Sequence, residues 1–175
     1  MTLLLSVDRT WSGEVLEPRD RAELHLRRDG DHLRIAVDAR FHGDPPPPGP
    51  PGPTPGLWEH EVVELFVAGP GSDDVVEYLE VELSPHGHHL VLRLRGVRRP
   101  VAEGLPLDFR AVIEGGRWRG EARVPRSWLP PPPHRAAAFA IHGSGAARRY
   151  LASVALPGER PDFHQPGRFP PVELP

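Results

Sequence analysis

Alternating apolar and charged side chains predict β-strands along most of this chain. Between residues 33 and 41 every odd position is apolar, whereas three of the four even positions carry a charge. This period of two is expected of a strand with one buried face. Residues 25–28 precede this strand across Asp29-Gly30, which is a hairpin signal because both turn positions tolerate positive φ. The two segments therefore predict an antiparallel hairpin.

The same alternation recurs through the rest of the chain. Further strands are expected at residues 76–84, 89–95, 107–114, 117–124, 136–142 and 149–154. Turns at Pro85-His86-Gly87 and Gly115-Gly116 join two pairs of them. No 3.6-residue pattern persists for three helical turns. Roughly ten short strands punctuated by Gly and Pro predict an all-β fold, an antiparallel two-sheet β-sandwich of jelly-roll-like type with little helix.

One domain is expected to span residues 1–175, because a chain of this size buries roughly 70% of its unfolded surface. Its clearest interruption is DPPPPGPPGPTPG at 44–56, where successive prolines exclude both ladder hydrogen bonds and a helix. We interpret this segment as a Pro-rich surface loop. Its alternative role is a ligand for a proline-recognising domain. A second proline run at 130–133 follows a single helical turn expected to begin at Pro125.

Charge and cysteine content narrow the possible partners. The 24 acidic and 21 basic residues and the pI near 6.4 give no global positive field, so we expect no nucleic-acid partner. The absence of cysteine excludes disulfides and thiolate metal sites.

The longest apolar run, 136–141, is far shorter than the roughly 20 residues of a membrane helix, and the first residues do not match a secretory signal. We expect no membrane partner, a cytoplasmic location, and a monomer or weak homodimer.

A glutamate interrupts the most apolar strand pattern. The run LWEHEVVELFV covers residues 57–67, and alternation places Glu64 on the same strand face as Val62 and Phe66. An unpaired carboxylate there would cost several kcal/mol or be driven to its neutral form. Glu64 therefore needs an arginine, a metal or a bound ligand beside it. We predict an arginine such as Arg93 first and a ligand second.

Charged side chains also occupy the strand faces opposite the apolar rows. If the predicted hairpins are neighbours, one sheet surface carries Glu80, Glu82, His89, Arg93, Arg95, Asp108, Arg110, Arg117, Arg119, Glu121 and Arg123. One interpretation is a solvated outer face, on which cross-strand charge pairs contribute a few tenths of a kcal/mol each. The other is a concave polar groove that meets sugar hydroxyls or an anion.

Motifs for metal binding and catalysis are weak. Residues 85–89 read PHGHH and could supply imidazole ligands, but the glutamate that would continue a cupin motif is missing from 90–94. We predict no metal site and no cofactor.

Motifs for catalysis are weak as well. Paired glutamates could hydrolyse a glycoside. His142 precedes Gly143-Ser144-Gly145, but this segment lacks the G-x-S-x-G spacing of a nucleophile elbow. No P-loop or dinucleotide fingerprint occurs, so an enzyme is the less favoured class and no catalytic residue is assigned.

Four segments together resemble a known superfamily: LWEHEVVELFV, EYLEVELSPHG, FAIHGSG and DFHQPGRF. They are similar to DOMON-like sandwiches of the carbohydrate-binding module type 9 branch. In that branch a Trp-Glu-x-Asp/Glu-x-x-Glu-x-Phe strand precedes a Tyr-x-Glu strand, and a Phe-His-x-Pro-x-x-Phe segment closes the domain. The resemblance spans residues 57–171. Within the branch, the chain looks most like a small family of uncharacterised single-domain proteins of bacteria and animals.

The resemblance implies a two-sheet sandwich that binds sugar ends between aromatic rings. The motif positions of the family fall on Trp58, Glu59, Glu61, Glu64, Tyr78, Glu80 and His164. We add Arg93 and His142 to this candidate ligand-binding set. Other DOMON relatives bind haem through methionine and histidine, and haem is disfavoured here because Met1 is the only methionine.

The sequence leaves three functions open. The favoured one is a non-catalytic module that binds a small carbohydrate-like or anionic metabolite in a polar groove, with an aromatic ring stacking on the ligand. The second is a small enzyme acting on a sugar-like substrate, with glutamates and His142 or His164 as acid and base. The third is a structural protein without a ligand, in which Glu64 and Glu80 pair with arginine inside the sandwich.

Overall fold

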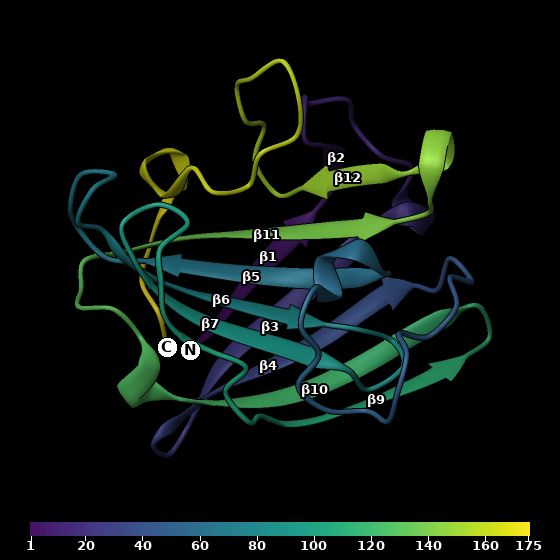
Figure 1. Ribbon diagram of the computed structural model, residues 1–175, viewed down its shortest axis with the longest axis horizontal. Coiled ribbons are helices and arrows are strands. Elements are labelled where there is room, and N and C mark those ends of the chain that lie inside the picture. Colours follow the sequence, from purple (N-terminus) through teal and green to yellow (C-terminus); the bar gives the residue numbers. More distant parts are fainter.

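The computed structural model describes all 175 residues and consists mainly of strands (Figure 1). The strands are β1 (Thr2–Val7), β2 (Arg9–Thr10), β3 (Ala22–Asp29), β4 (His32–Arg40), β5 (Val62–Ala68), β6 (Glu77–Leu83), β7 (His89–Arg95), β8 (Pro100–Glu103), β9 (Asp108–Glu114), β10 (Arg117–Pro125), β11 (His134–His142), β12 (Arg149–Ala152) and β13 (Pro171–Val172). The helical segments are the short 3-10 turns η1 (Pro18–Asp20), η2 (Leu57–Glu59), η3 (Arg126–Trp128), η4 (Gly145–Ala147) and η5 (Pro166–Arg168). None of these helices has the length and apolarity needed to cross a membrane.

The strands form two antiparallel sheets. The five-stranded sheet has the order β1-β3-β4-β10-β9, and the larger sheet runs β2-β12-β11-β5-β6-β7-β8 with β13 paired to β11. Figure 1 shows β11, β5, β6 and β7 of the larger sheet in front of β3, β4 and β10. The predicted all-β sandwich with little helix is confirmed.

The core between the sheets follows from the period of two. Ile35 on β4, Val81 on β6 and Trp118 on β10 are fully or almost fully buried in it. Gly120 makes room for the largest of these side chains, because a Cβ at this position would lie 2.8 Å from the Trp118 ring and 3.0 Å from the Phe109 ring. A larger residue there would push two aromatic rings out of the core.

A second apolar layer covers the outer face of the larger sheet. Phe66 on β5 and Phe139 on β11 lie beneath Phe163 and Phe169, which belong to the segment that follows β12. The ring centroids of Phe139 and Phe163 are 4.2 Å apart. Every residue of β5 is therefore buried, on both faces of the sheet. The run 57–67, expected as one strand, instead begins with the turn η2 before β5.

The prediction of a single charged surface is wrong. β6 and β7 lie in the larger sheet, whereas β9 and β10 lie in the five-stranded sheet. Charged residues of β6 and β7 also lie on opposite faces of the larger sheet. Arg93 is opposite Leu79, on the face toward the core between the sheets, whereas Glu80 points to the outer face. On the five-stranded sheet, Arg117 binds Asp38 at 2.6 Å. The charged residues thus belong to several surfaces, because sheet membership and register were not visible in the sequence.

Candidate functional site

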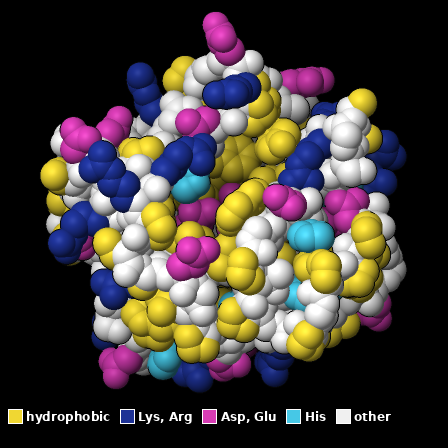
Figure 2. All heavy atoms as spheres, viewed as in Figure 1, with side chains coloured by type: hydrophobic (Ala, Val, Ile, Leu, Met, Phe, Trp, Pro, Cys, Tyr) yellow, Lys and Arg dark blue, Asp and Glu magenta, His cyan; other side chains and the backbone are white.

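A cavity of about 390 Å³ opens in the outer face of the larger sheet. Figure 2 shows this face hollowed near its centre, with acidic and apolar side chains at depth. The residues that line the cavity are Trp58, Glu64, Phe66, Glu80, Leu92, Leu94, Arg98, Pro100, Glu103, Ile141, Tyr150, Pro161, Asp162, Phe163 and His164. They come from β5 to β8, β11, β12, the turn η2 and two loops, so folding brings together residues that are distant in sequence.

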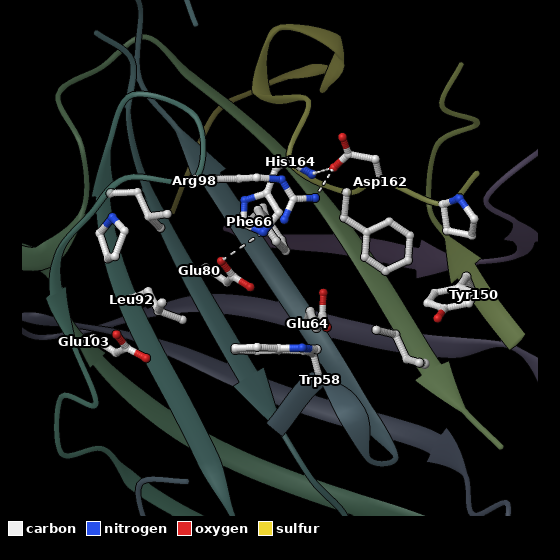
Figure 3. Close-up of a pocket in the computed structure, with 15 residues that line it drawn as sticks. Trp58, Glu64, Phe66, Glu80, Leu92, Arg98, Glu103, Tyr150, Asp162 and His164 are labelled. Atoms are coloured by element: carbon white, nitrogen blue, oxygen red, sulfur yellow. Dashed lines mark hydrogen bonds and ion pairs between the residues drawn. The ribbon is translucent and has the colours of Figure 1, made fainter. Parts of the chain in front are cut away.

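Two buried glutamates, Glu64 and Glu80, line the cavity, and a third, Glu82, lies beside them on the same face of the sheet. Glu64 on β5 is opposite Glu82 on β6, and Glu80 lies two residues before Glu82 on the same strand face. Their exposed fractions are 2%, 0% and 4% for Glu64, Glu82 and Glu80. Figure 3 shows the carboxyl groups of Glu64 and Glu80 within the pocket. These three side chains are termed the carboxyl cluster below.

The carboxyl cluster is only partly satisfied by hydrogen bonds. Oε2 of Glu80 and both carboxyl oxygens of Glu82 have no hydrogen-bond partner. Burial and then the charges of Glu64 and Glu80 raise the pKa of Glu82 well above its ordinary range. Burial also raises the pKa of Glu64, with the charge of Glu80 as the next cause, and it raises the pKa of Glu80 to about 7. A proton held by Glu82 would allow it to donate to Glu80.

The predicted arginine partner of Glu64 is wrong. No arginine nitrogen lies within 4.0 Å of any carboxyl oxygen of the cluster, and the one basic side chain within that distance is the imidazole of His164, beside Glu80. Arg93 lies instead beside Glu77, Trp128 and neighbouring residues, in a separate small pocket. A buried carboxyl without a cation is stabilised by taking up a proton, which is the direction of the pKa shifts found here.

A series of contacts leads from the carboxyl cluster to the rim of the cavity. Nε2 of His164 lies 3.8 Å from Oε2 of Glu80. Nδ1 of His164 lies 2.8 Å from the Tyr78 hydroxyl oxygen, which accepts the backbone N–H of Arg98 at 2.9 Å. Nδ1 is the one acceptor that contacts the buried Tyr78 O–H, so we infer that the hydroxyl donates to Nδ1 and that the ring proton of His164 is on Nε2, facing Glu80. Burial lowers the pKa of His164 to about 4, so its ring is neutral at neutral pH.

Arg98 fixes this rim through a costly backbone conformation. It is the one non-glycine residue with positive φ, at 60°, a region that side chains other than glycine seldom adopt. The conformation directs its N–H to Tyr78, while its guanidinium donates to Oδ1 of Asp162 at 2.8 Å. The same oxygen accepts the backbone N–H of His164 at 2.9 Å. Arg98 and Asp162 therefore hold His164 over the cavity.

Aromatic side chains stand on the opposite rim. Trp58 is 44% exposed although it lines the cavity, and Figure 3 shows its indole extending beside Glu64. Arg148 donates to the backbone carbonyls of Trp58 and Glu59 and, from Nε, to the Tyr150 hydroxyl at 3.2 Å. Its guanidinium also lies 5.6 Å from the centroid of the Tyr150 ring. The exposed indole is thus carried on a braced turn and offers a flat apolar face.

The cavity brings together part of the predicted site. Trp58, Glu64, Glu80 and His164 line it, and Tyr78 lies directly behind His164. Glu59, Glu61, Arg93 and His142 do not line it. The exposed side chain of Glu59 makes no hydrogen bond, and only its backbone carbonyl is used, by Arg148.

Glu61 and His142 belong to a separate cluster. The Glu61 carboxylate accepts the backbone N–H groups of His42 at 2.9 Å and Asp44 at 3.3 Å. Asp44 in turn accepts the N–H of Gly143 at 2.7 Å, and the rings of His42 and His142 stack with centroids 3.4 Å apart. Burial raises the pKa of Glu61 to about 7 and lowers that of His142 to about 4. This cluster, termed the loop anchor, ties the start of the Pro-rich segment to β11.

The histidines in residues 85–89, where β6 turns into β7, each have a different partner. Nε2 of His86 lies 3.0 Å from the Asp44 carbonyl, and Nδ1 of His88 lies 2.9 Å from the Thr54 hydroxyl. His89 accepts a backbone N–H at 3.1 Å. The contacts of His86 and His88 hold the turn against both ends of the Pro-rich segment 44–56.

Sequence reasoning missed several residues around the cavity: Arg98, Glu103, Arg148, Tyr150 and Asp162. It placed Glu82 on a charged strand face but did not include it among the candidate binding residues. Asp162 could have been found, because it opens the DFHQPGRF motif two residues before His164. The role of Arg98 had no local signal, since it depends on a backbone conformation and on two partners from distant segments.

No family model matches the chain. The Danio rerio UPF0462 protein C4orf33 homolog is 45% identical over 77% of this chain and 71% of its own length. The Mus musculus homolog is 44% identical over 96% and 90%, and Homo sapiens UPF0462 protein C4orf33 is 39% identical over 90% and 81%. This chain belongs to the UPF0462 family.

Solved structures resemble the UPF0462 chain in fold. A candidate carbohydrate-binding protein from Bacteroides uniformis aligns with a TM-score of 0.70 at 16% identity, covering 97% of this chain and 84% of that chain. A family 9 carbohydrate-binding module from Caldicellulosiruptor kristjanssonii, in complex with cellotriose, aligns with a TM-score of 0.49 at 15% identity over 75% and 64%. The first alignment shows a β-sandwich like those of carbohydrate-binding modules. The narrower DOMON resemblance stays a prediction.

Proposed function

We propose that this UPF0462 chain is a non-catalytic module that binds one small carbohydrate-like ligand in the cavity beside Trp58. The observation that carries the proposal is the combination of the exposed indole of Trp58 with a buried, unpartnered carboxyl oxygen of Glu80 in one hollow. A sugar presents an apolar ring face and several hydroxyls, which such a site matches by stacking and by hydrogen bonding. The shared fold of the Bacteroides uniformis protein supports the proposal.

The dimensions and charges of the cavity define the ligand further. A volume of about 390 Å³ lies in the lower part of the range of small-molecule sites, about 300–1,000 Å³, and suits a monosaccharide or disaccharide. Glu64 and Glu80 would bind hydroxyls, and Trp58 would stack on the ring. The anionic metabolite considered from the sequence is disfavoured, because the one lining arginine, Arg98, is already bound to Asp162.

Substitution of Trp58 tests this proposal. Monosaccharides and disaccharides would be titrated into the protein by calorimetry, with indole fluorescence as a second measurement. Trp58→Ala should weaken binding by about tenfold or more, because it removes the stacking surface. Trp58→Phe keeps an aromatic ring and should retain most of the affinity. If no sugar changes the heat, the fluorescence or the melting temperature of the folded protein, the proposal is refuted.

A small enzyme acting on a sugar-like substrate is the second candidate. It is favoured by the approach of His164 to Glu80 inside the cavity, since buried carboxyl groups with raised pKa values can serve as general acids. If turnover of a glycoside is detected, Glu64→Gln or Glu80→Gln should reduce it by about 10²-fold or more. Turnover that persists in both variants would exclude these catalytic roles.

A further inference from the structure

The cavity holds more acidic than basic groups. Glu64, Glu80, Glu103 and Asp162 line it, and Arg98 is the one arginine among the lining residues. The guanidinium of Arg98 binds Asp162 at 2.8 Å. The other three carboxyl groups, those of Glu64, Glu80 and Glu103, line the cavity without a cationic partner. The cavity is therefore suited to a ligand that brings positive charge.

An unpartnered oxygen lies deep in this acidic lining. Glu80 is 4% exposed and lines the cavity, yet its Oε2 has no hydrogen-bond partner. Nε2 of His164 stands 3.8 Å away, beyond hydrogen-bond distance. Hydroxyl groups could satisfy such an oxygen, but an ammonium group offers three N–H donors and compensates the carboxylate charge as well.

We propose that the cavity selects ligands that carry a protonated amine on a pyranose-like ring, as amino sugars do, with the ammonium group at Glu64 and Glu80 and the ring against Trp58. This inference rests on the proposed sugar-binding function and narrows its ligand class. Phe66 and Tyr150 also line the cavity, and aromatic ring faces attract cations. A sugar that carries a carboxylate would be repelled by the same lining.

Binding of an amine should release a proton from the protein. The three carboxyl groups of the carboxyl cluster (Glu64, Glu80 and Glu82) are not all ionised in the free protein, because burial and mutual repulsion oppose their ionisation. A bound ammonium group compensates the negative charge and favours ionisation, so a proton moves to the solvent. A neutral sugar changes the charge balance far less. Proton release therefore distinguishes recognition of the amine from recognition of the ring.

Calorimetry with glucosamine, glucose, N-acetylglucosamine and cyclohexylamine tests the inference. Each would be titrated in two buffers of different ionisation enthalpy, at a pH where the amines are protonated. Glucosamine should bind about tenfold or more tightly than glucose and N-acetylglucosamine, since charge-assisted hydrogen bonds are roughly twice as strong as neutral ones. Its binding should also release a proton. Glu80→Gln should remove both effects, whereas Glu114→Gln, exposed on β9 of the other sheet, should keep them.

The outcomes separate this inference from the proposed function. Equal affinity for glucosamine and glucose would overturn amine selection and leave sugar binding intact. Binding of cyclohexylamine without any sugar would overturn sugar binding and retain amine recognition. Failure of all four ligands to bind would overturn both. The comparison of ligands on the unaltered protein remains decisive even if Glu80→Gln does not fold.

Discussion

Glu61 and Glu64 lie three residues apart and are both buried, yet their surroundings differ. The Glu61 carboxylate accepts two backbone N–H groups in the loop anchor. Glu64 lies in the carboxyl cluster, where Oε2 of Glu80 and both oxygens of Glu82 have no donor from outside the cluster. The first glutamate holds two segments of chain together, and the second faces a cavity. Burial alone therefore does not separate a structural glutamate from one available to a ligand, because the donors around it decide.

The largest change in stability is expected at Glu61, whose carboxylate accepts two backbone hydrogen bonds. Glu61→Ala leaves the backbone N–H groups of His42 and Asp44 without an acceptor and should reduce the free energy of unfolding by about 3 kcal/mol. Urea denaturation would measure the loss. Glu59→Ala, two residues away and exposed, is the control and should change stability by less than about 0.5 kcal/mol. Equal stability of the two variants would mean that Glu61 does not anchor the loop.

The opposite sign is expected in the carboxyl cluster. Glu82→Met replaces a fully buried carboxyl group that lacks donors with an apolar side chain of similar size. This change should raise the free energy of unfolding by about 1 to 3 kcal/mol at neutral pH. Denaturation of Glu82→Met and of the exposed control Glu114→Met would be compared. A loss of stability in Glu82→Met alone would reveal a partner for Glu82 and favour a structural role.

Stability should also decline as pH rises above about 6.5. The folded pKa values of Glu61 and Glu80, about 7, and the raised pKa of Glu82 exceed the ordinary value of 4.5. At these three glutamates the folded protein therefore holds more protons than the unfolded chain above pH 4.5. Each such group lowers the free energy of unfolding by about 1.4 kcal/mol per pH unit until the pH passes its folded pKa.

The buried histidines make stability rise with pH at lower pH, opposite to the effect of the glutamates. The pKa values of His142 and His164, about 4 in the folded protein, lie below the ordinary value of 6.5. Between these values the unfolded chain binds the additional protons, so stability rises with pH and offsets the glutamates. Urea denaturation at pH steps from about 5 to 8 should show the decline only above about 6.5. Glu82→Met should make it shallower, and an unchanged slope would contradict the raised pKa of Glu82.

The smallest change in stability is expected from loss of the Tyr78 hydroxyl, which contacts His164 and Arg98 at the rim of the cavity. Tyr78→Phe removes the hydroxyl between His164 and the Arg98 N–H and should lower the free energy of unfolding by about 1 kcal/mol. The ring nitrogen signals of His164 in NMR should also shift from one tautomer toward a mixture. Tyr150→Phe, which loses only the contact with Arg148, is the matched control and should leave them unchanged. Unaltered His164 signals in Tyr78→Phe would contradict the assignment of the ring proton to Nε2.

Much of the fold could be predicted because its signals are local. Antiparallel hairpins do form at all three predicted turns, β3 to β4, β6 to β7 and β9 to β10. The first turn consists of Gly30 and Asp31, one residue later than predicted, because Asp29 still belongs to β3 and pairs with His32. Positive φ at Gly30, Gly87, Gly115 and Gly116 accompanies these turns, so a few residues suffice to specify each hairpin. The candidate site was less predictable. Its motif residues were found, but Arg98, Arg148 and Tyr150 act through contacts with distant segments.

The sequence by itself determined most of the longer strands, three hairpins and the burial of Glu64, since these follow from side-chain alternation and turn chemistry within short segments. Only the tertiary structure decided that Glu64 meets Glu80 and Glu82 rather than Arg93. It also decided that Glu61 binds backbone N–H groups of a different segment. The physical reason is that these contacts depend on sheet order and register, and a shift of one residue moves every side chain of a strand to its other face.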